Sequence, residues 1–173
     1  MEFYDVLKKR RAVRSFTEEA VPQEMIAKLQ EAVKLAPTGL NKQPFKFLFV
    51  RNQELIRKIA KLYPYPADWA DKQLPPMIVA VLINADEAWH RDTGESIACV
   101  DAAIAMEHLQ LAAAAEGLAS CWICAFNQAT VDLLLDVRKP WTTFALSPVG
   151  FGKAVPTAPR TNKNDNELFK VID

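Results

Sequence analysis

The chain has 173 residues, 50% of them hydrophobic and 24% charged, a balance typical of one globular domain and unlike that of a disordered chain. Its 21 basic and 21 acidic residues cancel to a formal net charge of zero, which argues against a surface built for nucleic acid or an anionic membrane. The five glycines form neither phosphate-binding motif, two histidines exclude a His-rich metal site, and three cysteines exclude a disulfide framework. Without a signal region or an apolar stretch of about 18 residues, the sequence predicts a cytoplasmic protein.

The first half of the chain alternates apolar patterns of helical period with short apolar runs. The helices are predicted from apolar residues at three- and four-residue spacing, and the strand from a short aromatic and β-branched run. The predicted elements are a helix from Phe3 into the basic run 8–11, a helix from Pro22 to Leu35, a strand over 45–50 and a helix capped by Asn52. Residues 63–76 contain four prolines and are expected to form an irregular connection.

The second half begins with a continuous apolar run over 77–83, which predicts a strand covered on both faces. The longest helix, 96–116, is apolar almost all round, so we expect it to be buried in a core or against a partner chain. Ser96 is its expected N-cap and Gly117 its stop. The remaining predicted elements are a strand over 118–126, a helix over 128–137 and a strand over 144–151.

No linker, internal repeat or low-complexity tract interrupts residues 1–173, which we therefore predict to form a single domain. The order of helices and strands indicates an α/β or α+β architecture. The tail from Lys153 is polar and proline-containing, with a weakly apolar end.

A local excess of positive charge stands out in this neutral chain. Residues 8–14 hold five cations and no acid. One interpretation is a solvated helix end, where cations complement the helix dipole. The other is an anion site, because the arginines Arg10, Arg11 and Arg14 have side chains suited to bidentate contact with a phosphate or carboxylate. A nucleic-acid role is disfavoured, since no aromatic residues are interleaved for base stacking.

A second unusual segment is the polar loop over 36–45, with the sequence APTGLNKQPF. A helix stop and a turn account for Pro37 and Gly39. They do not account for Thr38, Asn41 and Gln43, whose donors and acceptors could read the polar edge of a heterocycle.

Together these segments resemble the nitroreductase family of FMN-dependent oxidoreductases. RRAVRSF at 10–16 resembles the family's R-R-S-x-R-x-F, and the loop over 36–45 resembles A-P-S-x-x-N-x-Q-P-W. Residues 101–109 resemble its D-x-x-x-A-x-x-x-L helix, 116–126 its G-L-x-x-C-W-I-G-A-F strand, and 148–152 a late strand that ends in a glycine turn. The matches occur in the family's order over residues 3–152.

The resemblance implies an α+β fold, a three-layer sandwich with a central mixed sheet of four to five strands between helices. It also implies a homodimer with FMN at the subunit interface and with the tail, 153–173, against the partner. The implied activity is transfer of a hydride from NADH or NADPH, by a ping-pong mechanism, to a small nitroaromatic, quinone or related acceptor. The flavin carries this chemistry, so no catalytic side chain and no metal are expected.

The resemblance also assigns cofactor-binding positions one by one. Residues near the N-terminus would contact the FMN phosphate and the pyrimidine edge, a loop of the other subunit would close over the flavin, and two backbone N–H groups would lie near N5. The implied positions are Arg10, Arg11, Ala12 and Arg14; Pro37, Thr38, Gly39 and Asn41 of the second subunit; Cys124 and Ala125 near N5; and Lys163 or Arg160 at the phosphate.

Two departures from the family pattern bear on cofactor binding. Ala12 replaces a serine and loses a hydroxyl donor, and Asp165 falls where arginine is frequent. They leave open a non-catalytic FMN-binding or flavin-handling protein, or a relative in fold alone. Cys121 and Cys124 form a C-x-x-C pattern, but on a strand their side chains would point to opposite faces, so a dithiol centre is not expected.

Overall fold

The structure is a computed structural model that describes residues 2–62, 74–154 and 156–172. Its strands form one sheet in the order β1-β2-β4-β3, with each neighbouring pair antiparallel. The strands are β1 (Phe45–Val50), β2 (Met77–Ile83), β3 (Ala119–Ser120) and β4 (Thr142–Gly150). The helices are α1 (Phe3–Lys9), α2 (Gln23–Lys34), α3 (Gln53–Ala60), α5 (Ala98–Ala115), α6 (Gln128–Leu134) and α7 (Asp165–Leu168), with short 3₁₀ turns at Gly39–Asn41 and Ala85–Glu87.

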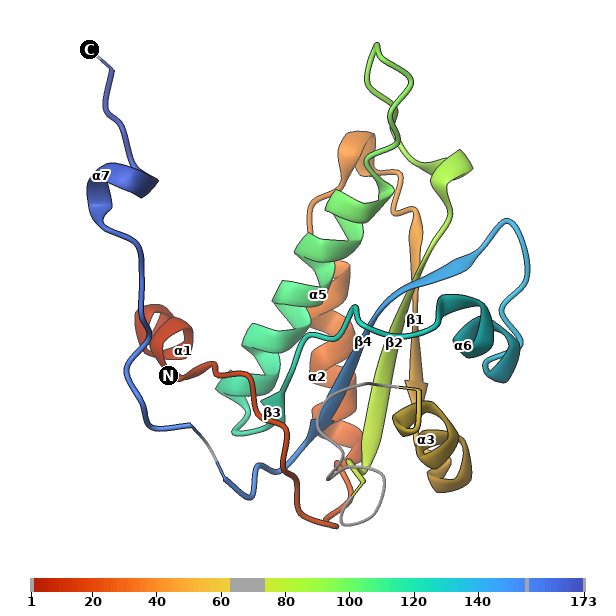
Figure 1. The fold of residues 1–173 in the computed structure, drawn as a ribbon, viewed down its shortest axis with the longest axis vertical. Coiled ribbons are helices and arrows are strands. Elements are labelled where there is room, and N and C mark those ends of the chain that lie inside the picture. The colour runs from red at the N-terminus through yellow and green to blue at the C-terminus, as the bar shows by residue number, and fades with distance from the viewer. Residues whose placement is uncertain (1, 63–73, 155, 173) are drawn as a thin grey trace.

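The central strand β2 is buried along its whole length, as its continuous apolar run predicts. Because side chains alternate across a strand, its two faces enter two different cores. Val79 and Val81 pack in the cluster that holds the buried residues of α2 and α5, and Ile78 and Ala80 in the cluster that holds those of α3 and α6. The result is the expected three-layer α+β sandwich, with the sheet between two pairs of helices (Figure 1).

The parallel component of the expected mixed sheet is small among the described residues. It consists of an isolated bridge between Ala12 and Ser120, supported by a hydrogen bond of 2.9 Å from the Val13 N–H to the Ser120 carbonyl. This bridge holds the extended chain after α1 against the β3 edge of the sheet. It therefore places the basic run beside the end of α5.

The strand predicted over 118–126 is wrong in extent, because the regular strand β3 covers only Ala119–Ser120. Ile123 resumes the same register with an isolated bridge to Leu146. Between these points Cys121 faces Pro148, which has no N–H to donate to the ladder. The ladder is thus interrupted after Ser120 and resumes only at Ile123, and Cys124 and Ala125, which follow this bridge, lie in no strand.

Helix α5 is buried along much of its length, as expected for a helix without a polar face. Its N-cap is Ile97 rather than Ser96, although the Ser96 hydroxyl still accepts a hydrogen bond of 3.3 Å from the Ala98 N–H. Gly117 ends the helix with a φ of +80°, which favours glycine. The predicted C-terminal stop is therefore confirmed, and the predicted cap is off by one residue.

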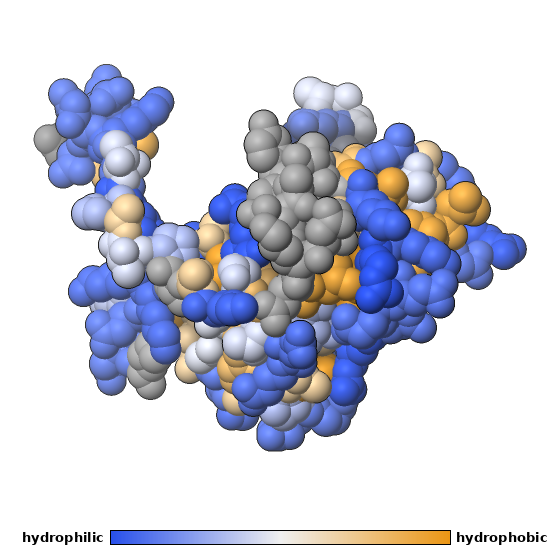
Figure 2. Space-filling view, turned by 60° about the horizontal axis from the view of Figure 1, so that its bottom comes forward, coloured by the Kyte–Doolittle hydropathy of each residue, from blue (hydrophilic) through white to orange (hydrophobic). Residues whose placement is uncertain are grey.

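After Gly152 the tail passes beside α1 and then extends away from the sandwich, and α7 lies near its far end (Figure 1). Seen from below, the end of the tail stands clear of the main body (Figure 2). Its apolar side chains Phe169, Val171 and Ile172 are 69%, 84% and 82% exposed. Within residues 2–62, 74–154 and 156–172, no helix has the length and apolar character needed to cross a bilayer. Most of the predicted connection over 63–76 lies outside the described residues.

Candidate functional site

A small cavity lies between the end of α1 and the C-terminal end of α5. Its volume is about 110 Å³, and the cations Lys9, Arg10 and Arg11 contribute to its lining together with residues 117–120. Pockets that enclose whole small ligands measure roughly 300–1,000 Å³. A cavity of this size and charge therefore suits one anionic group at the end of a larger ligand, and the donor chemistry suits a phosphate.

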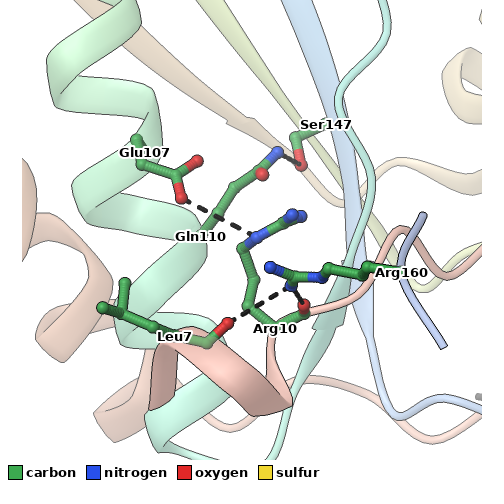
Figure 3. A network of polar contacts seen from close by, with 6 residues as sticks. All are labelled: Leu7, Arg10, Glu107, Gln110, Ser147 and Arg160. Atoms are coloured by element: carbon green, nitrogen blue, oxygen red, sulfur yellow. Dashed lines mark hydrogen bonds and ion pairs between the residues drawn. The ribbon is translucent and has the colours of Figure 1, made fainter. Parts of the chain in front are cut away.

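The arginines at this cavity are held by contacts from distant parts of the chain (Figure 3). Arg10 extends toward α5, with its Nε 3.7 Å from Glu107 Oε1. Arg160 of the tail donates to the carbonyl oxygens of Leu7, at 3.2 Å, and of Arg10. Arg11 donates in turn to the carbonyl of Ala158 in the tail. Tail residues near position 160 thus lie beside the basic run, although they are 150 residues away in sequence.

This arrangement separates the two tail candidates for the phosphate site. Both are exposed and neither lines the cavity, but Arg160 contacts the backbone of Arg10, which does line it. Asp165 lies farther along, as the first residue of α7. Lys9 also lines the cavity, although it was not among the predicted site residues. It belongs to no family motif, and the one sequence signal that could have indicated it is its place in the run of cations.

The polar loop has an uncommon backbone conformation, which is stabilised by local hydrogen bonds. Leu40, Asn41 and Gln43 have φ values of +49°, +55° and +48°, in the left-handed region. The Gln43 N–H donates to the Thr38 hydroxyl at 3.1 Å, and the Gln43 side chain donates to Asn41 Oδ1 at 3.0 Å. The Gly39 N–H donates to Asp101 Oδ1 at 3.1 Å. Thr38, Gly39 and Asn41 are therefore brought together as one folded unit.

The structure does not bring this loop to the basic run of the same chain. The loop is hydrogen-bonded to Asp101 in the first turn of α5, whereas the cavity is lined by Ala114 in the last turn of the same helix. At 1.5 Å of helix rise per residue, these two positions are about 20 Å apart. The arginines and the polar loop thus form two separate groups within one chain.

Cys124 and Ala125 lie exposed on the segment that leaves the sheet edge after β3. The Phe126 N–H donates back to the Cys124 carbonyl at 3.1 Å, and the Trp122 indole N–H donates to Cys124 Sγ at 2.8 Å. Among the described residues, the N–H groups of Cys124 and Ala125 have no hydrogen-bond acceptor. Two backbone donors are therefore available at the position that the resemblance places near flavin N5.

The cysteines of the C-x-x-C pattern occupy different environments, and both are free thiols. Cys121 is 1% exposed, whereas Cys124 is exposed. Burial raises the pKa of the Cys121 thiol, and the positive charges of Arg14 and Arg10 offset part of that rise. Arg14 and Arg10 therefore lie close enough to this thiol to act on it electrostatically.

The three thiols are expected to differ in reactivity toward iodoacetamide, because alkylation needs an accessible thiolate. Cys121 should stay unmodified in the folded protein. Cys99, which is exposed, should react with a rate that increases at more alkaline pH than for an ordinary thiol, because partial desolvation and the nearby Cys124 raise its pKa. Peptide mass spectrometry across a pH series measures this, and protein unfolded in guanidinium, where all three react, is the control. Early labelling of Cys121 would contradict the structure.

An apolar groove lies between α1, α2 and α5. It has a volume of about 340 Å³, and Phe3 and Leu35 at its rim are 62% and 71% exposed. His108 also lines it and is hydrogen-bonded through Nδ1 to the Ala32 carbonyl at 3.3 Å. The other lining residues are Val6, Leu111, Ala112 and Ala115. Exposed apolar surface of this kind is typical of a protein–protein contact.

Comparison with known proteins identifies the family. The model of the nitroreductase family matches residues 7–84 and 67–151, so the chain belongs to the nitroreductase family. A relative from Methanothermobacter thermautotrophicus, named "Putative NADH dehydrogenase/NAD(P)H nitroreductase", is 26% identical over 98% of this chain and 83% of its own.

Two solved structures have the same fold. A nitroreductase family protein from Clostridium novyi NT is 33% identical, with a TM-score of 0.81 over 88% of this chain and 86% of its own. An FMN-dependent nitroreductase from Clostridium difficile R20291 is 21% identical, with a TM-score of 0.81 over 97% of this chain and 98% of its own. The expected family and fold are confirmed.

Proposed function

We propose that the protein is an FMN-dependent oxidoreductase that uses NADH or NADPH to reduce a small nitroaromatic, quinone or related acceptor by a ping-pong mechanism. The observation that carries this proposal is the cationic cavity beside the end of α1, sized for a phosphate and too small for a whole cofactor. Bound FMN would supply the redox chemistry, namely hydride acceptance from the nicotinamide and electron transfer to the acceptor. The chain's own residues bind and orient the cofactor.

Arg10 and Arg11 are the proposed phosphate ligands, because both line the cavity and both present charged donors. Ala12 would contribute its backbone N–H, since its side chain has no donor. Arg160 is the better candidate than Lys163 for the tail contribution, because it already lies at the carbonyl of Arg10. Arg160 would then hold the end of α1 in place while the arginine side chains contact the phosphate.

The flavin ring would lie farther along the β3 edge. Arg14, near the Cys121 thiol, would place positive charge beside the pyrimidine edge, where negative charge develops on reduction. The exposed N–H groups of Cys124 and Ala125 would donate hydrogen bonds near N5. Each of these groups acts as a donor or as a positive charge, so none has to transfer a proton for the cofactor to react.

We propose that the functional unit is a homodimer, for two reasons. In its own chain the loop holding Pro37, Thr38, Gly39 and Asn41 lies about 20 Å along α5 from the arginines, and the family resemblance assigns this loop to the cofactor of a second copy. The apolar groove and the exposed apolar end of the tail also lack contacts within residues 2–62, 74–154 and 156–172 that would bury them. A second subunit would cover both.

The visible spectrum of the purified protein tests this function. We expect bound flavin as purified or after FMN is added, loss of its absorbance on anaerobic addition of NADH or NADPH, and recovery when a quinone or nitroaromatic follows. FMN uptake without turnover would favour the flavin-handling alternative. A protein that takes up no FMN at all would be a relative in fold alone, and the proposal would fail.

A further inference from the structure

Asp101 is a buried acid in the first turn of the apolar helix α5. Only 2% of the residue is exposed. An isolated carboxylate in such a place is costly, so buried acids are kept where they are paired or hydrogen-bonded. Asp101 Oδ1 accepts a hydrogen bond from the Gly39 N–H at 3.1 Å, while Oδ2 is fully buried and has no partner among the described residues. The carboxylate is thus directed to the polar loop.

Gly39 is the residue of this loop that packs against the start of α5, while Lys42 contacts the Ala88 carbonyl elsewhere. A Cβ at position 39 would lie 2.7 Å from Ile97 Cδ1 and 3.0 Å from Trp89 Cβ, so a side chain there would require these neighbours to shift. Directly after it, Leu40 and Asn41 adopt positive φ values of +49° and +55°. The contact with Asp101 therefore sits at the base of a backbone conformation that non-glycine residues rarely adopt.

We propose that Asp101 is a positioning residue for cofactor binding, which fixes the Gly39 backbone and thereby the Thr38 and Asn41 side chains. A charged acceptor is well suited to this, because hydrogen bonds to carboxylates are stronger than those to neutral groups. The N-terminal end of α5 compensates part of the negative charge. The inference rests on the proposed function, because the loop is assigned to the cofactor there.

Two substitutions separate the acceptor from the bulk of the side chain. Asp101→Asn keeps an oxygen that can accept from Gly39, and Asp101→Leu keeps a similar size without an acceptor. We expect Asp101→Leu to raise the FMN dissociation constant about tenfold or more and Asp101→Asn to stay within about threefold of wild type. Fluorescence titration of the FMN-free dimer measures both, with amide hydrogen exchange of residues 37–44 as a second readout. Exchange should be faster in Asp101→Leu alone.

Asp132→Leu is the matched control. Asp132 on α6 also holds a backbone N–H, that of Thr143 at 2.8 Å, but it lies on the other face of the sheet. We expect this variant to lower the melting temperature and to leave the FMN dissociation constant unchanged. An Asp132→Leu effect on FMN as large as that of Asp101→Leu would reduce Asp101 to a general structural role and overturn the proposal.

The remaining outcomes are also decisive. Wild-type affinity in Asp101→Leu, or equal weakening in the Leu and Asn variants, would overturn the proposal while the proposed function stands. If wild-type protein takes up no FMN, the proposed function fails and the cofactor-binding role of Asp101 fails with it. The exchange experiment then still shows whether Asp101 holds the loop, which distinguishes the two failures.

Discussion

Replacing Arg10 by alanine is expected to raise the FMN dissociation constant by about 10- to 150-fold, which corresponds to the roughly 1.5–3 kcal/mol of a charge-assisted hydrogen bond. Arg10 lines the cavity proposed for the phosphate, and its side chain is the one held by Glu107. That ion pair is long, at 3.7 Å, and the Glu107 side chain is 48% exposed, so it competes weakly with a bound phosphate. Arg10 can therefore turn to the cofactor at little cost.

Lys8→Ala is the control for this measurement. Lys8 is an exposed residue of α1, the helix that Arg10 follows, and it does not line the cavity, so the substitution removes the same charge without a direct contact. Its FMN affinity should stay within about twofold of wild type at physiological salt, where exposed charges are screened. Equal losses in both variants would mean that net charge rather than Arg10 drives binding. Unchanged affinity in Arg10→Ala would remove Arg10 from the site.

The second large effect concerns which subunit supplies the polar loop. An Arg10→Ala chain and a Thr38→Ala/Asn41→Ala chain should each form homodimers that bind FMN roughly tenfold or more weakly, since every site carries a defect. In a mixed dimer of the two, arginines from one chain meet the loop of the other. One of its two sites is then intact and the second is doubly impaired.

Mixed dimers can be isolated by co-expressing the two chains with different affinity tags and purifying on both. At an FMN concentration that fills only intact sites, we expect half the flavin absorbance of wild-type dimers treated in the same way. If each loop served its own chain, every site of the mixed dimer would carry one defect, and its flavin content would match that of the variant homodimers. Failure to recover any doubly tagged protein would contradict the homodimer.

Most of the elements could be predicted because their signals are local. The buried strand over 77–83 and the amphipathic helix that starts after Pro22 follow from periodicity and from proline or glycine at their ends. The strand predicted over 118–126 was wrong in extent, because the apolar pattern is a local signal whereas the hydrogen bonds of a strand depend on the neighbouring strand. Pro148, 27 positions beyond Cys121, removes the donor that would have continued the ladder.

For the candidate site as well, one part could be predicted from the sequence and another part depends on the tertiary structure. Residue type and order are enough to mark the arginines and the polar loop, because a guanidinium carries its charge and donors in any fold. Their positions relative to one another follow from packing. Arg160 reaches the end of α1 only because the tail folds back past it, and Asp101 holds Gly39 only because α5 packs beside the loop. The amino-acid sequence therefore specifies which groups can bind a phosphate and a heterocycle. The tertiary structure decides where these groups lie, and it places the arginines and the polar loop about 20 Å apart along α5. The physical reason is that hydrogen bonds between residues distant in sequence form only after the layers pack.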